Sequence, residues 1–194
     1  MLVVKLDDFN EYYLNEAKKI IDRLDRKKID DAINMLLDAY KKEKQIFIIG
    51  NGGSATTATH FANDLTKSCS IEDKKRFRAI SLTDNISTIT ALANDTSYDK
   101  IFSEQLLNLI NKDDILIALT ASGNSPNVIE AVKVAKQHGA KTLAFLGFNG
   151  GKLKNMADGY ILIEYGDFGL VESTHLLLEH LLVTFMRKRL LGEI

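Results

Sequence analysis

Apolar positions in the first part of the chain recur at the spacing of amphipathic helices. Two stripes are present, formed by Leu14, Ala17, Ile21 and Leu24, and then by Ile29, Ala32, Ile33, Leu36, Leu37 and Tyr40. Because residues three and four apart lie on one face of a helix, each stripe predicts a helix with one buried side. Glycine and proline are absent before Gly50. Residues 1–44 are therefore expected to form a pair of uninterrupted helices.

From position 45 onward, the pattern changes to short apolar runs separated by helical stretches. The runs are "QIFIIG" (45–50), "FRAISL" (77–82), "DILIAL" (114–119), "KTLAFLG" (141–147) and "YILIEY" (160–165). Continuous apolar strands that alternate with helices are typical of a parallel sheet covered by helices on both faces. Residues 45–168 are therefore expected to form an α/β core with about five parallel strands.

The last helix, expected over residues 169–191, is apolar on more than one side, as "LLLEHLLVTFM" illustrates. A helix on the surface of its own domain needs only one apolar stripe. We therefore expect this helix to pack against a partner subunit, as could the two N-terminal helices, and burial within its own domain is the alternative. Neither a linker nor a low-complexity tract nor a repeat divides the sequence, so residues 1–194 are predicted to form one domain.

Composition and charge narrow the class of function. The formal net charge is −1 and the basic residues do not gather in one run, so nucleic acid is not expected as a partner. The single cysteine, Cys69, excludes an intramolecular disulfide and suits a reducing compartment. Every apolar run is shorter than the roughly 18–20 residues of a membrane-spanning helix, and the start, "MLVVKLDDFNEYY", lacks a signal peptide's features. We expect a cytoplasmic protein that binds no membrane.

Two glycine-rich loops follow strands of the predicted sheet, where ligands bind in open parallel sheets. "GNGGSATTA" follows the first strand and "TASGNSPN" the third, and each leads into a helix. Backbone N–H groups and hydroxyls at such a helix start can bind an anion. Either loop alone could simply cap its helix; the two together favour a phosphate site. Neither matches the P-loop or the dinucleotide-binding motif.

A further polar segment, "TDNISTITALANDTSYD", follows the second strand. Its Asn94 and Asp95 suit either a turn or cap, or polar contact with a hydroxylated ligand. We expect this segment to contain a short helix.

Titratable side chains gather on two of the predicted helices. His60 and Asp64 share a face because they are four residues apart, and Glu172, His175, Glu179 and His180 lie in the apolar last helix. Charged groups there are costly unless they are paired or functional. His60, Asp64, Glu172 and His180 would suit zinc or a similar divalent ion, or could act as general acid and base. However, Glu172 and His180 are about 12 Å apart on a straight helix. Both can bind one ion only if the helix bends near Glu172 or if two subunits contribute.

Taken together, these segments resemble the sugar isomerase (SIS) domain family, and within it the phosphoheptose isomerase branch. The resemblance rests on "GNGGSA…HFANDL", "ISTITALANDTSYD", "SGNSPNV" and the last helix with His175 and His180, and it covers essentially the whole chain. It implies a flavodoxin-like sheet and a cytoplasmic homotetramer with active sites at subunit interfaces. The implied reaction converts sedoheptulose 7-phosphate into D-glycero-D-manno-heptose 7-phosphate, and we expect it to pass through an enediol.

The resemblance also implies roles for individual residues. Residues matched to the family's phosphate site are Ser54, Thr120, Ser122 and Ser125. Residues matched to its sugar contacts are Asn51, Gly52, Gly53, Asn94 and Asp95, with Glu172 also expected to contact substrate. Residues matched to its zinc ligands are His60, Asp64, Glu172 and His180, of which Asp64 and His180 form the acid/base pair.

Three positions depart from the family pattern. Asp64 stands where glutamate is usual, Glu172 where glutamine is usual, and Ala121 in place of a phosphate-loop hydroxyl. Proton transfer needs heavy atoms within about 3 Å or one bridging water, so a shorter carboxylate bears directly on catalysis. Glu172 could then act as the base or bind a metal more tightly. These departures keep two alternatives open: an isomerase of another sugar phosphate, and a phosphosugar-binding or protein-scaffolding module without turnover.

Overall fold

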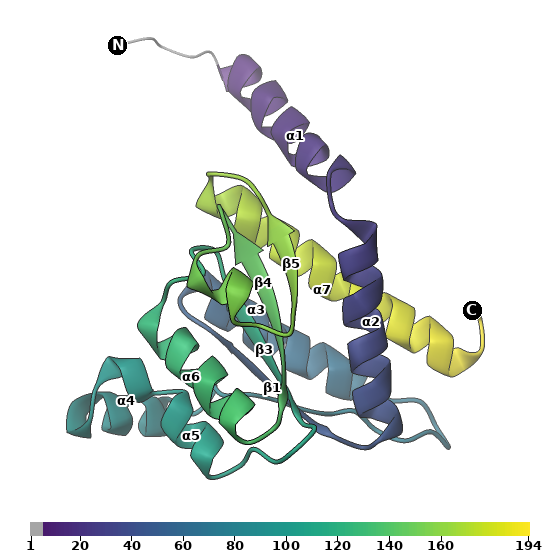
Figure 1. Cartoon of the computed structure of the whole chain (residues 1–194). Coiled ribbons are helices and arrows are strands. Elements are labelled where there is room, and N and C mark those ends of the chain that lie inside the picture. The colour runs from purple at the N-terminus through teal and green to yellow at the C-terminus, as the bar shows by residue number, and fades with distance from the viewer. Residues whose placement is uncertain (1–5) are drawn as a thin grey trace.

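A computed structural model describes residues 6–194 of the chain (Figure 1). The strands are β1 (Gln45–Gly50), β2 (Arg78–Ser81), β3 (Ile115–Thr120), β4 (Lys141–Gly147) and β5 (Gly159–Ile163). The α-helices are α1 (Leu6–Asp22), α2 (Arg26–Lys41), α3 (Gly53–Asn63), α4 (Ile86–Asp95), α5 (Ser103–Leu107), α6 (Pro126–Gln137) and α7 (Phe168–Leu191). The predicted pair of N-terminal helices and the long last helix are confirmed. Positions 1–5 of the predicted pair lie outside the described residues.

All strand pairs of the sheet are parallel, and the strand order is β2-β1-β3-β4-β5. This is the flavodoxin-like order, in which the chain reverses direction across the sheet between β1 and β3. The predicted α/β class is therefore confirmed. The last strand ends at Ile163, two residues earlier than the sequence pattern indicated, and β2 is a four-residue edge strand.

Helices cover both faces of the sheet, as Figure 1 shows. The larger core lies between the sheet and α2, α3 and α7, with Leu36, Phe61, Phe145 and Leu178 fully buried. The second core lies on the opposite face under α5 and α6, with Phe47, Phe102 and Val132 buried. None of the helices in residues 6–194 has the length and apolarity needed to cross a membrane.

Helix α1 departs from the predicted pattern because it projects beyond the sheet (Figure 1). Leu14 and Ile21, expected on the buried side, are 69% and 45% exposed. Ile20 is buried instead, and Tyr13 and Ala17 pack against the larger core. Within one chain α1 therefore leaves much of its apolar surface uncovered. Helix α7 similarly buries Leu178 and Leu182 yet leaves Leu177 and Leu181 exposed.

The turn between β1 and α3 brings two glycines into tight surroundings. A Cβ atom at Gly50 would lie 2.6 Å from the backbone carbon and oxygen of Ser54. A Cβ atom at Gly53, the first residue of α3, would collide with the carboxylate of Glu172 on α7. The absence of side chains at these positions therefore allows a sharp turn and a close approach of α7 to the start of α3.

These two contacts predict different results for alanine substitution. Gly50→Ala is expected to lower the free energy of unfolding by about 1–3 kcal/mol, because backbone atoms cannot move aside cheaply. Gly53→Ala should leave stability close to that of the parent protein, because the carboxylate is the end of a flexible side chain and alanine favours helix. Urea unfolding of both variants at neutral pH checks this. Equal destabilisation by the two substitutions would show that Glu172 cannot move away from α3.

His175 of α7 is a buried histidine without a hydrogen-bond partner among the described residues. Its ring packs edge-on against Phe145 of β4, with 5.9 Å between ring centroids. Burial lowers the pKa of His175 from 6.5 to about 4, because the protonated ring would lose its hydration. The folded protein therefore holds His175 in its neutral form at neutral pH.

The lowered pKa of His175 predicts an acid-sensitive fold. Below pH 6.5 the unfolded chain protonates His175 while the folded chain does not, so stability is lost as the pH falls toward 4. By pH 5 this loss amounts to about 2 kcal/mol relative to pH 7.5. His175→Leu should remove that part of the pH dependence in urea unfolding measured at both pH values. An unchanged difference between the two pH values in the variant would contradict the assignment.

Candidate functional site

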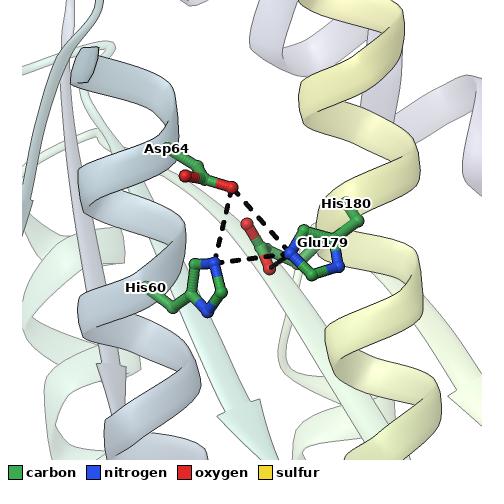
Figure 2. A group of neighbouring side chains, drawn as sticks. All are labelled: His60, Asp64, Glu179 and His180. Carbon is green, nitrogen blue, oxygen red and sulfur yellow. Dashed lines mark hydrogen bonds and ion pairs between the residues drawn. The ribbon is translucent and has the colours of Figure 1, made fainter. Parts of the chain in front are cut away.

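Helices α3 and α7 place four titratable side chains opposite one another, as Figure 2 shows. His60 lies in the last turn of α3, and Asp64 opens the π-helical turn Asp64–Ser68 that follows it. Glu179 and His180 lie on the facing helix, α7. One nitrogen or oxygen from each of the four lies within 4.8 Å of the others. Of the predicted metal ligands, the structure thus brings together His60, Asp64 and His180.

Distances within this cluster, His60–Asp64–Glu179–His180, are short. Nε2 of His180 lies 3.3 Å from Nε2 of His60, 3.9 Å from Oδ2 of Asp64 and 3.6 Å from Oε2 of Glu179. Nε2 of His60 lies 3.5 Å from Oδ2 of Asp64. Donor atoms about 2.0–2.2 Å from a zinc ion lie about 3.3–3.6 Å from one another in a tetrahedron. The cluster could therefore hold a zinc-like divalent ion if its wider separations, of up to 4.8 Å, contract.

Exposure differs across the cluster. The side chains of His60 and His180 are 42% and 47% exposed, whereas that of Asp64 is mostly covered and that of Glu179 is fully buried. Neither carboxylate oxygen of Glu179 has a hydrogen-bond partner in residues 6–194. Burial, and next the charge of Asp64, raise the pKa of Glu179 to about 8. The imidazoles therefore face the accessible side of the cluster and Glu179 forms its floor.

Glu172 lies outside this cluster within one chain. Helix α7 is continuous from Phe168 to Leu191, so the bend that would bring Glu172 to His180 is not present. Glu172 instead lies against Gly53 at the start of α3. Contribution of Glu172 from a second subunit stays a prediction. The fourth member of the cluster is Glu179, which the sequence indicated only as a costly charge in an apolar helix.

The two glycine-rich loops meet at a separate pocket of about 140 Å³ at the carboxyl ends of β1 and β3. Predicted substrate contacts that line this pocket are Asn51, Ser54, Thr120, Ser122, Ser125 and Glu172. Neither lysine nor arginine is among its lining residues in the described chain. Ser125 is the N-cap of α6 and makes no side-chain capping bond there, so its hydroxyl remains available to a ligand. The pocket can thus bind an anion through hydroxyls and helix-start N–H groups.

Hydrogen bonds fix the orientation of Asn51 at the pocket. Its amide exchanges two hydrogen bonds with the buried Asn127, at 3.0 and 2.8 Å, and the hydroxyl of Tyr98 donates to its oxygen at 3.0 Å. Sequence reasoning did not single out Asn127 or Tyr98, although both stand inside the polar segments quoted above. Asn127 directly follows Pro126, and only the fold reveals that it faces the first loop.

The other predicted sugar contacts lie away from the pocket lining. Asn94 and Asp95 lie exposed at the end of α4, where the Asn94 amide donates to Asp95 at 2.8 Å. Gly52 is the N-cap of α3, with a positive φ of 55° that suits glycine. Gly53 follows it and contacts Glu172. The two glycines therefore shape the turn, and sugar contact by Asn94 and Asp95 stays a prediction.

Comparison with known proteins identifies the family and supports the fold. The sequence matches the family description "SIS domain" over residues 12–147. A phosphoheptose isomerase of Helicobacter pylori (strain P12) is 38% identical over 85% of this chain and 85% of its own. A probable phosphoheptose isomerase of Thermoplasma acidophilum is 36% identical over 91% of this chain and 97% of its own.

Solved structures agree with these sequence matches. A phosphoheptose isomerase from Neisseria gonorrhoeae superposes with a TM-score of 0.87 at 29% identity, covering 94% of this chain and 98% of its own. A phosphoheptose isomerase from Francisella tularensis superposes with a TM-score of 0.87 at 30% identity, covering 96% of this chain and 100% of its own. The chain therefore belongs to the SIS domain family.

Proposed function

We propose that this protein is a phosphoheptose isomerase, which converts sedoheptulose 7-phosphate into D-glycero-D-manno-heptose 7-phosphate. The observation that carries the proposal is the combination of a hydroxyl-lined phosphate pocket with a His/Asp/Glu cluster, to both of which α3 and α7 contribute residues. Relatives named phosphoheptose isomerases, at 36–38% identity over most of the chain, support the same reaction.

The spacing of pocket and cluster suits a seven-carbon sugar phosphate. Gly53 and His60 are two turns apart on α3, as are Glu172 and Glu179 on α7, which corresponds to about 10 Å along each axis. In an open-chain heptose 7-phosphate the phosphate and the carbonyl stand at opposite ends. Binding of the phosphate to Ser122 and Ser125 would thus direct C1 and C2 toward His60 and His180.

The reaction in this arrangement is a proton transfer between C1 and C2. Asp64 takes a proton from C1, which leaves an enediol, and returns it to C2, so that the atoms of substrate and product are the same. When no ion is bound to its Nε2, His180 donates a proton to the oxygen on C2 and accepts one from the oxygen on C1. Oδ1 of Asp64 accepts a hydrogen bond from Ser68 at 3.2 Å, which orients the carboxylate.

Zinc is the ion we assign to the His60–Asp64–Glu179–His180 cluster, because imidazole and carboxylate donors in a small tetrahedral space suit it. When bound, such an ion polarises a carbonyl oxygen and stabilises an enediolate.

We extend the proposal to a homotetramer in the cytoplasm. Exposed apolar side chains support further subunit contacts: Leu6, Phe9 and Tyr12 on α1, and Leu177 and Leu181 on α7. A hollow of about 310 Å³ between the α1–α2 junction and β5, lined by Leu24 and Tyr160 among others, offers a further place for a second copy. The unpaired thiol of Cys69 suits a reducing compartment.

Activity of the purified protein with sedoheptulose 7-phosphate tests the proposal. Asp64→Asn and His180→Ala are each expected to lower kcat by about 10²–10⁴-fold, the usual contribution of a positioned acid or base. Ser122→Ala combined with Ser125→Ala should instead raise KM, because it removes two hydroxyls from the phosphate pocket.

Three results would contradict parts of this assignment. Parent-level turnover by Asp64→Asn and His180→Ala would remove their roles as acid and base. Stabilisation of the protein against heat by the sugar phosphate, without conversion, would indicate a binding module. Turnover of a hexose phosphate at a higher kcat/KM would identify an isomerase of another sugar.

A further inference from the structure

We propose that Glu179 is a metal ligand, so that the divalent-ion site is complete within one chain and does not require Glu172. This inference rests on the proposal that the cluster binds a metal ion. It concerns which residues bind the ion and not the reaction that the ion assists.

Donor atoms of four side chains converge at this site. His60 and Asp64 approach from the end of α3, whereas Glu179 and His180 approach from α7 (Figure 2). Oε2 of Glu179 lies 3.6 Å from Nε2 of His180, the atom that also faces His60 and Asp64. Two imidazole nitrogens and two carboxylate oxygens therefore surround one small volume. When both carboxylates are ionised, their two negative charges match the charge of a divalent ion.

The environment of Glu179 also supports a bound cation. Its side chain is fully buried, and the part of the chain that the structure describes provides neither oxygen with a hydrogen-bond donor. A buried carboxylate without a partner is strongly unfavourable. The groups that face it are Asp64, which adds a like charge, and His180. A cation bound between them would favour the ionised form of Glu179, which burial and the charge of Asp64 disfavour.

Glu172 lies too far along α7 to share an ion with Glu179 within one chain. Seven residues of continuous α7 separate Glu172 from Glu179, which places the two carboxylates about 10 Å apart along the helix. Glu172 also lies against Gly53 and lines the phosphate pocket. Within one chain, Glu172 therefore serves the sugar-phosphate pocket and Glu179 serves the ion.

The donor set further indicates which ions bind. Imidazole nitrogens favour zinc and cobalt over magnesium and calcium, which prefer oxygen ligands. The exposed imidazoles of His60 and His180 leave the outer side of the ion open to a small ligand. Four protein donors fill a zinc tetrahedron, so a small ligand would bind from that side as a fifth donor.

Metal binding by the full-length, chelator-treated protein tests this inference without reference to turnover. Zinc affinity is measured by competition with a chromophoric chelator, and Co²⁺ is used as a visible probe of coordination. Glu179→Gln keeps the shape of the side chain but removes its charge, and it should weaken zinc at least tenfold and change the Co²⁺ spectrum. Glu172→Gln, the matched control on the same helix, should bind both ions as the parent protein does. His60→Ala should weaken zinc strongly.

Circular dichroism checks that the variants fold. If Glu179→Gln does not fold, Glu179→Asp is used in its place. Glu179→Asp keeps the negative charge, but its shorter side chain moves the carboxylate oxygens away from the ion. The zinc affinity of this variant should therefore also fall. Parent-like affinity in the Glu179 variants, or loss of zinc in Glu172→Gln, overturns the inference and favours a site shared between subunits. A parent protein that binds neither ion also overturns it. Isomerase activity in such a metal-free protein would leave the proposed function standing.

Discussion

The packing of α3 against α7 is the contact on which the rest of the site depends. At one end of the contact Gly53 admits the carboxylate of Glu172, and further along His60 and Asp64 meet Glu179 and His180. The two helices are more than a hundred residues apart in sequence, and both lie on the same face of the sheet. Phe145 of β4 holds them in place, because it packs against Phe61 of α3 and His175 of α7. The four titratable side chains are thereby held on helical elements, whereas loops line most of the separate pocket.

The fold could be predicted well from the sequence because its signals are local. Apolar runs and helical stripes reflect which faces are buried, and a parallel sheet requires strands and helices to alternate. The prediction for α1 was incomplete, because Leu14 and Ile21 of its apolar stripe are exposed within one chain. Whether a stripe is buried depends on what lies beside the helix, and periodicity alone does not contain that information.

The site was predictable only in part, for the same physical reason. Loops at strand ends predict a pocket, and a histidine and an aspartate four residues apart predict a shared helix face. Glu179 and Glu172 are two carboxylates on one helix, however, and only the position of α3 beside α7 decides which of them meets His60. The useful signal was the cost of a charge in "LLLEHLLV", which marks Glu179 as a residue that needs a partner.

The exposed apolar surface of α1 has a consequence for how the molecule responds to dilution. An isolated helix of this length is marginal in water, and Leu6, Phe9 and Tyr12 gain nothing from exposure to solvent. Where a second copy covers these side chains, ordering of α1 becomes a bimolecular event whose equilibrium depends on total protein concentration. Lowering that concentration would then loosen α1 as a mild denaturant does, while the sheet and its two cores retain their own stability.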